Sequence, residues 1–180
     1  MPPGTKRSAG LLMYRISRAR LEVLLVHPGG PFFATKDAGI WSIPKGEIGD
    51  TEDALEAATR EFREETGVEP RGPFLPLGTV RQRGGKTVAA WAFEGDCDPR
   101  AMRSNTFTLE WPPQSGKRRE FPEVDRAAFL AVPDAIAKIN QAQVSLLWEL
   151  EDLVRKSHPE LVGAAPRTPP PGDGEPSLFD

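Results

Sequence analysis

The sequence predicts one α/β domain in which helices pack on a mixed β-sheet. Short apolar runs rich in Leu and Val lie on both sides of an amphipathic helix, and two more helical segments follow near the end of the chain. Strands that flank a helix in this order favour a mixed sheet with helices packed on it. A chain of 180 residues fits one such domain.

The individual elements are predicted from periodicity and turn residues. A hairpin is expected over 8–28, where two apolar runs flank a short polar stretch, and residues 29–40 are a Gly-rich connector. Further strands are expected over 74–82, 86–96 and 105–111, the first two joined by "RGG". Residues 132–140, with Pro133 near the first turn, and 143–157 are predicted helices.

A central helix is predicted from about Thr51, which can cap it, to Thr66. Leu55, Ala58 and Phe62 are spaced three and four apart, so they form one apolar stripe that faces the sheet. Gly67 supplies the stop, because a residue without a side chain readily takes the left-handed conformation that ends helices.

The same helix concentrates negative charge near its end. Glu61, Glu64 and Glu65 lie three and four residues apart, so their carboxylates share one side of the helix and repel one another. A hard divalent cation such as Mg²⁺, which prefers oxygen ligands, would remove that penalty together with phosphate oxygens. The alternative is a solvated acidic face that pairs with Arg60 and Arg63.

Composition excludes several classes of protein. The net charge of −3 argues against broad binding to nucleic acid or anionic membranes. The single cysteine, Cys97, allows no internal disulfide and suggests a reducing compartment, and no apolar run approaches the roughly 20 residues of a membrane span. We therefore expect a cytoplasmic protein, with a flexible N-terminus (1–7), a folded domain (8–160) and a disordered Pro/Gly-rich tail (161–180).

The spacing of the loop and helix carries a family resemblance. Gly46 is followed by Glu52 after five residues and by Arg60 after seven more, and then by "EFREETGV". This pattern resembles the Nudix box, G-x5-E-x7-R-E-U-x-E-E-x-G-U, where U is a bulky apolar residue, and it matches at every specified position. The resemblance covers about residues 8–157 and implies a Nudix-like α/β/α sandwich with the box helix packed on the sheet.

The resemblance also implies roles for the box residues. Metal ions held by Glu61, Glu64 and Glu65, Mg²⁺ or alternatively Mn²⁺, would serve the hydrolysis of a pyrophosphate bond in a nucleoside diphosphate linked to another group. Arg60 would orient a catalytic glutamate, with Glu52 supporting it. Gly46 would let the loop turn tightly.

Residues outside the box are candidates for the base and for phosphate binding. The resemblance implies that the catalytic base is either a box glutamate, Glu61 or Glu64, or a glutamate of a later loop, where Glu120 and Glu123 are candidates. Glu123 matches the family better than Glu120, although it could equally be a charge at a helix N-terminus. Lys45 precedes the box and is a candidate phosphate ligand. Arg81, Arg83 and Lys86 are further candidates for binding an extended polyphosphate, against the alternative of a solvated loop.

The expected partner is a small nucleotide, bound by a monomer or homodimer. The stretches "WSIPKGE" and "PEVDRAAFL" favour a dinucleoside polyphosphate or a nucleoside triphosphate. ADP-ribose hydrolases typically have a proline about fifteen residues beyond the box, and this proline is missing here. Many diadenosine polyphosphate hydrolases have a tyrosine slightly farther on, and it is also missing. The alternatives are a catalytically idle nucleotide sensor of the same fold and a pyrophosphatase of broad range that accepts ADP-ribose or nucleotide sugars.

Overall fold

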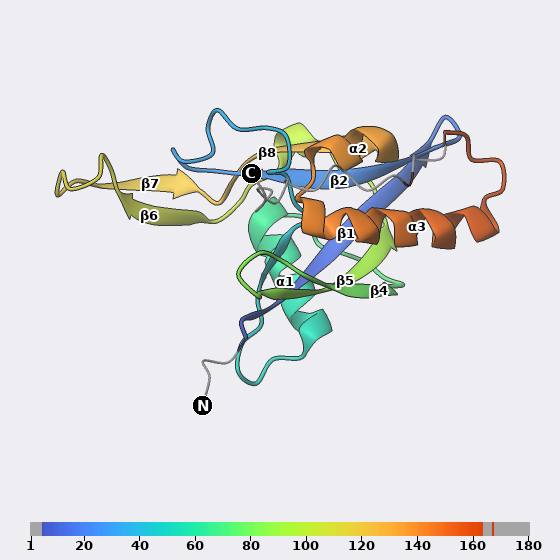
Figure 1. Ribbon diagram of the computed structural model, residues 1–180, viewed down its shortest axis with the longest axis horizontal. Coiled ribbons are helices and arrows are strands. Elements are labelled where there is room, and N and C mark those ends of the chain that lie inside the picture. The colour runs from blue at the N-terminus through green and yellow to red at the C-terminus, as the bar shows by residue number, and fades with distance from the viewer. Residues whose placement is uncertain (1–4, 164–166, 168–180) are drawn as a thin grey trace, which may run out of the picture.

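The computed structural model describes residues 5–163 and 167, which form a mixed sheet with helices on both faces (Figure 1). The strands are β1 (Arg7–Ser17), β2 (Arg20–Pro28), β3 (Lys45–Glu47), β4 (Leu75–Arg81), β5 (Thr87–Glu94), β6 (Thr106–Glu110), β7 (Arg118–Pro122) and β8 (Val124–Ala131). The helices are α1 (Ala54–Thr66), α2 (Val132–Lys138) and α3 (Val144–Ser157), with short 3₁₀ helices η1 (Pro99–Ala101) and η2 (Gln141–Gln143).

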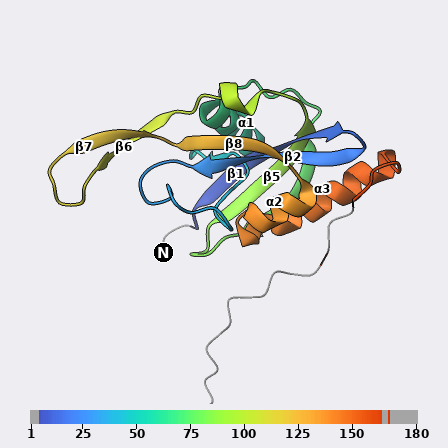
Figure 2. The ribbon, with the colours of Figure 1, turned by 90° about the horizontal axis from the view of Figure 1, so that it is seen from above.

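The main sheet has the order β4-β5-β1-β2-β8, with β3 also paired to β1. The β1–β5 pair is parallel and the other pairs are antiparallel, so the sheet is mixed as predicted. Figure 2 shows the sheet between α1 on one face and α2 and α3 on the other. The predicted α/β/α sandwich is therefore confirmed.

Each face of the sheet buries its own apolar cluster. Phe62 and Ala58 of α1 pack with Leu11 and Phe93, whereas Leu147 and its neighbours in α3 pack on the opposite face. Alternate residues of β1 point to opposite faces, so Leu11 and Met13 face α1 while Leu12 and Tyr14 face α3. Burial on both faces explains why this strand is almost continuously apolar.

The predicted N-terminal hairpin is confirmed, and its far end opens to receive the loop before α1. Arg18 and Ala19 form the turn with φ of 52° and 59°, as a two-residue hairpin with the right-handed twist requires. At the other end β3 pairs with β1, and Ser42 pairs with Val26 of β2. The segment 41–47 thus lies between β1 and β2, which pair directly with each other only nearer the hairpin turn. This pairing holds the segment beside the end of α1.

Helix α1 begins later than the sequence predicts. Asp53, not Thr51, is the N-cap, because its carboxylate accepts hydrogen bonds from the backbone N–H of Leu55 (3.1 Å) and Glu56 (3.4 Å). Of the predicted stripe, Ala58 and Phe62 are fully buried, whereas Leu55 is only partly buried. Gly67 ends the helix with φ of 73°, as predicted.

Asp53→Ala is expected to lower the free energy of unfolding by about 1 kcal/mol, because two N–H groups at the start of α1 lose their acceptor. Thr51→Ala, two residues earlier, is the control and should change it by less than about 0.5 kcal/mol. Urea unfolding of both variants measures the difference. Equal losses would contradict the assignment of the cap.

The region after β5 contains strands that the sequence did not reveal. Residues 118–131, for which the sequence predicted no strand, form β7 and β8, and β7 pairs with β6 in a separate hairpin that projects from the body (Figures 1 and 2). Arg118 and Arg119 in β7 and Asp125 and Arg126 in β8 hide the usual apolar alternation. β8 is also the edge strand, where charged residues are common.

The packed domain extends slightly beyond the predicted limits of 8 and 160. Arg7 belongs to β1, and Leu161 is buried, with the backbone N–H of Val162 donating to the Ala19 carbonyl at 2.9 Å. Most of the predicted disordered tail, 164–166 and 168–180, lies outside the described residues. Among those described, none of the helices combines the length and the apolar character needed to span a membrane.

Candidate active site

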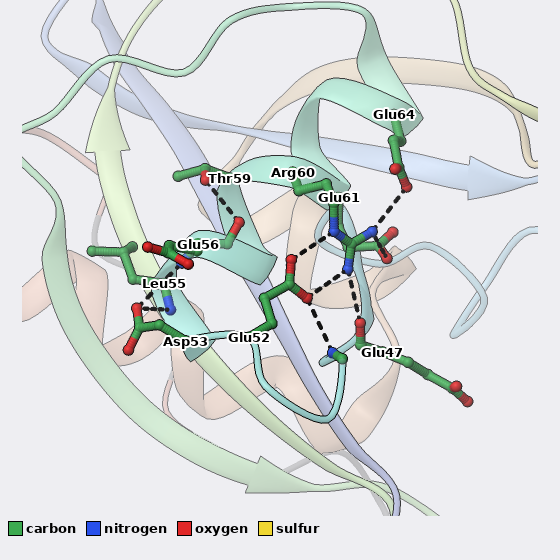
Figure 3. Close-up of polar contacts among 10 residues, drawn as sticks. Glu47, Glu52, Asp53, Leu55, Glu56, Thr59, Arg60, Glu61 and Glu64 are labelled. Atoms are coloured by element: carbon green, nitrogen blue, oxygen red, sulfur yellow. Dashed lines mark hydrogen bonds and ion pairs between the residues drawn. The ribbon is translucent and has the colours of Figure 1, made fainter.

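Arg60 lies at the centre of a cluster of carboxylates at the loop–α1 unit (Figure 3). Its Nε and Nη2 donate to the two oxygens of Glu52 at 2.8 and 2.9 Å, a bidentate pair. Its Nη1 donates to Glu61 at 2.8 Å and to Glu64 at 3.1 Å, and Nη2 also reaches the Glu47 carbonyl at 3.0 Å. One guanidinium therefore positions two carboxylates of the triad and ties the helix to the preceding loop.

Glu52 holds this guanidinium in place. The Arg60 hydrogen bonds, assisted by the Gly49 backbone N–H at 3.0 Å, lower the pKa of Glu52 to about 2. The carboxylate lies in the turn before α1 and not on the helix, so it can approach Arg60 from outside the triad. Glu52 is thus a permanent anion whose contacts orient Arg60.

Gly46 makes room for the Glu61 carboxylate. A Cβ at position 46 would lie 2.0 Å from Glu61 Cδ and 2.2 and 2.3 Å from its two oxygens. Gly46 is in β3, pairs with Ala9 and has no positive φ, so the expectation of a tight turn is wrong. The position needs glycine because the carboxyl group of Glu61 packs directly against the backbone.

Glu65 is the most buried acid of the triad. Its Oε2 accepts from the backbone N–H of Lys45 at 3.2 Å. Burial raises the pKa of Glu65 to about 8, against the lowering effect of the Lys45 charge. Burial likewise raises the pKa of Glu61, and it lowers that of Lys45, which Lys86 lowers further. Ionising these acids therefore costs energy that the cations of the chain do not fully offset.

Glu123 comes from a distant part of the sequence to the same place. It lies between β7 and β8, not at a helix N-terminus, with its N–H donating to Asn105 (2.8 Å) and its carbonyl accepting from Gly29 (2.9 Å). Its pKa is raised first by burial and then by the charges of Glu61 and Glu64. Glu120, the other candidate base, bonds Thr106 on the exposed β6–β7 hairpin.

A cavity of about 270 Å³ adjoins these acids and is bordered by Lys45, Glu65 and Glu123. Its opposite wall carries amides that sequence reasoning did not select: Gln82, Asn140 and Gln143. The buried Gln143 donates to Gln82 at 2.9 Å and to Ser42 at 3.0 Å, and accepts from the Ile43 N–H at 3.0 Å. No sequence motif signals these amides, because three separate segments bring them and their partners together.

The predicted phosphate-binding cations differ in their exposure and in whether they line this cavity. Lys45 lines it, whereas Arg81 and Arg83 are exposed at the end of β4 and in the turn to β5. Lys86 is partly buried, and its charge acts on Lys45. Gln82, between the two arginines, is the residue of this turn that lines the cavity.

The aromatic residues near the site do not all pack in the core. Trp41 does, with its Nε1 donating to Asp37 at 2.8 Å and its ring against His27. Phe32 is 56% exposed, packs edge-to-face on Trp111 of the projecting hairpin, and precedes Phe33, which lines the cavity. Phe32 and Phe33 therefore lie outside the apolar core.

His27 has a structural role that the sequence did not indicate. It is fully buried, with Nδ1 2.7 Å from Asp125 and Nε2 2.7 Å from the Lys36 carbonyl. Asp125 is in β8 and Lys36 is in the connector between β2 and β3. His27 therefore joins the connector that carries Phe33 to the sheet edge that follows Glu123.

Arg60→Lys is expected to lower kcat/KM by about 10–100-fold, the usual cost of removing a group that orients metal-site ligands. A lysine keeps the charge but cannot make the bidentate pair with Glu52 while contacting Glu61 and Glu64. Steady-state kinetics across a Mg²⁺ titration measures the loss. Arg63→Lys, on the same helix but paired with Glu69 at 2.5 Å, is the control, and a similar loss in it would contradict the role of Arg60.

Carboxylates at the end of a helix, beside a cavity lined by a lysine and three amides, suit a nucleotide pyrophosphohydrolase. The family model of the NUDIX domain matches residues 4–147. The chain therefore belongs to the Nudix family, and with its complete box it is a pyrophosphohydrolase.

Solved structures with the same fold include an Ap4A hydrolase and a NUDIX domain complexed with ADP ribose. A C. elegans Ap4A hydrolase binary complex aligns with a TM-score of 0.61 and 22% identity, covering 84% of this chain and 99% of that one. The NUDIX domain of Shewanella oneidensis NrtR complexed with ADP ribose aligns with a TM-score of 0.56 and 18% identity, covering 86% and 89%. The E. coli ORF135 protein aligns with a TM-score of 0.53 and 18% identity, and the alignment covers 87% of this chain and 97% of that one. At these identities the likeness concerns the fold.

Proposed function

We propose that the chain hydrolyses a dinucleoside polyphosphate or a nucleoside triphosphate with the help of a divalent metal ion. The observation that carries this proposal is the meeting of Glu61, Glu65 and Glu123 beside a cavity that also contains Lys45. Negative charge and a cation at one cavity suit a polyphosphate that arrives with metal ions.

The carboxylates fit a hard cation such as Mg²⁺. Glu61, Glu64 and Glu65 offer only oxygen ligands, and burial raises the pKa of Glu61 and Glu65, so a divalent charge would relieve the cost of ionising them. Within residues 5–163 and 167, no three acidic, His or Cys side chains already form a metal-binding group. Glu61 and Glu64 instead turn to Arg60. A bound metal would lower the pKa of a water molecule and neutralise phosphate charge.

The chain's own residues would orient the reactants. Arg60 keeps Glu61 and Glu64 on the cavity side of α1, and Lys45 offers a partly desolvated cation to a phosphate. Glu123 has a carboxylate near those of Glu61 and Glu64, so we assign it the proton that the attacking water loses. The backbone contacts with Asn105 and Gly29 restrict its position.

The choice of substrate rests on the sequence and on the similarity to the Ap4A hydrolase. The segments around Lys45 and Glu123 favour a dinucleoside polyphosphate, and the chain covers nearly all of the C. elegans enzyme. The similarity to the NrtR domain, which was solved in complex with ADP ribose, supports ADP-ribose as the second candidate substrate.

The test is to incubate the purified protein with Mg²⁺ and diadenosine tetraphosphate, with ATP, GTP and ADP-ribose in parallel, and to separate the products by ion exchange. We expect ATP and AMP from diadenosine tetraphosphate at the highest kcat/KM, and no product when EDTA removes the metal. Higher kcat/KM for ADP-ribose would transfer the assignment to the second candidate. Binding without turnover of any substrate would identify a nucleotide sensor.

A further inference from the structure

A second cavity, of about 410 Å³, borders the same buried acid as the first. It is lined by Glu65, Trp41 and Val124, by Met102 and Arg100 near η1, and by Arg126 of β8. Its size falls in the range of about 300–1,000 Å³ that is usual for ligand sites. The cavity has no role in the site described above.

The two cavities meet at two residues, since Glu65 and Val124 line both. Glu65 belongs to the proposed metal ligands, and Val124 directly follows the proposed base, Glu123. A ligand that extended from one cavity into the other would therefore pass beside the carboxylates. A mononucleotide needs only one of these cavities, whereas a dinucleoside polyphosphate has a nucleoside at each end of its phosphate chain.

The second cavity combines cations with apolar surface. The Arg100 side chain is 92% exposed, and its ion pair with Asp98 at 3.3 Å is a surface contact of the kind that contributes little. Arg126 lies over the Trp41 ring, with Cζ 5.5 Å from the centroid. Guanidinium groups bind phosphate and stack on bases, and Met102 and Ala127 add an apolar wall.

Asp125, which lines this cavity together with Glu65, is already paired. Asp125 Oδ1 lies 2.7 Å from His27 Nδ1, and Arg126 Nε is 3.7 Å from the same oxygen. Asp125 therefore opposes a phosphate less than a free carboxylate would. The two arginines then offer a bound polyphosphate positive charge beside the acidic centre.

We infer that this second cavity binds the second nucleoside of a dinucleoside polyphosphate, together with its nearest phosphate, while the first cavity binds the other end. Arg100 contacts the phosphate, and the base lies against Met102 and Arg126. This inference rests on the proposed function, and it assigns substrate selection to η1 and β8, outside the family box.

The experiment compares diadenosine tetraphosphate with ATP, which lacks the second nucleoside and the phosphate nearest to it. Arg100→Glu is expected to lower kcat/KM for diadenosine tetraphosphate by about tenfold, as loss of one charge-assisted contact does. The Ki of ATP as a competitor of diadenosine tetraphosphate should change less than about threefold. ATP carries a similar negative charge, so a long-range charge effect would weaken both ligands.

Two further variants make the result specific. Met102→Trp, which fills the cavity with apolar bulk, should reproduce the selective loss, with thermal unfolding as the check on the fold. Arg20→Glu makes the same charge change at the exposed start of β2, at the end of that strand away from the first cavity. It should leave both kcat/KM and Ki unchanged.

Equal losses for both ligands in Arg100→Glu, or unchanged kinetics in both Arg100→Glu and Met102→Trp, would overturn the second-nucleoside site while leaving the proposed function intact. Failure of the wild-type protein to hydrolyse diadenosine tetraphosphate, with hydrolysis of another nucleotide, would overturn the proposed substrate and this inference together. The two failures are therefore distinguishable in the same set of assays.

Discussion

Glu64→Gln is expected to lower kcat by on the order of 10²–10³, the usual cost of removing one group that stabilises charge in the transition state. The replacement has the same shape but a neutral amide, and the Glu64 side chain is partly exposed on α1, where its carboxylate accepts a hydrogen bond from Arg60 at 3.1 Å. The fold should therefore stay intact. Steady-state kinetics at saturating Mg²⁺ and circular dichroism measure the two effects.

Glu56→Gln is the matched control for this experiment. Glu56 is exposed in the first turn of the same helix and lies outside the acidic triad, so the same change there should leave kcat within about twofold. If Glu64→Gln kept wild-type kcat, the acidic face would be a solvated surface and the metal assignment would be wrong. The solvated interpretation already explains Arg63 poorly, because Arg63 pairs with Glu69 outside the triad.

Gly46→Ala is expected to lower kcat by about 10²-fold, the loss that a displacement of about 1 Å causes in a catalytic group. The added methyl would lie 2.0 Å from Glu61 Cδ, so either β3 or the Glu61 carboxyl must move. Glu61 also receives a hydrogen bond from Arg60, so its displacement would disturb the cluster of carboxylates. Thermal unfolding measured beside kcat separates a local shift from general destabilisation.

Gly49→Ala provides the control three residues later in the same loop. Its Cβ would meet Glu52 at 3.5 Å, an ordinary contact, and Gly49 is not among the positive-φ residues. This variant should keep kcat within about twofold. Equal kcat losses in the two variants would mean that the loop tolerates no side chain at all, and the close approach to Glu61 would not be the reason for Gly46.

The sequence by itself determined the features that depend on local spacing. The apolar stripe of Ala58 and Phe62, the stop at Gly67 and the proximity of Arg60 to Glu61 and Glu64 follow from 3.6 residues per helical turn. Together with the spacing from Gly46 and Glu52, they were sufficient to predict the sandwich fold and the family. The hairpin of β1 and β2 was predictable for the same local reason, alternating apolar runs around a short polar turn.

Only the tertiary structure decided which distant residues meet this helix. Glu123 reaches the acids because β7 and β8 carry the chain back to the open end of β1 and β2, and charged residues in those strands hid them from pattern analysis. The reason for Gly46 likewise appears only once Glu61 packs against it, 15 residues away in the chain. Both cavities form between segments remote in sequence, so their shape depends on packing that no local pattern encodes.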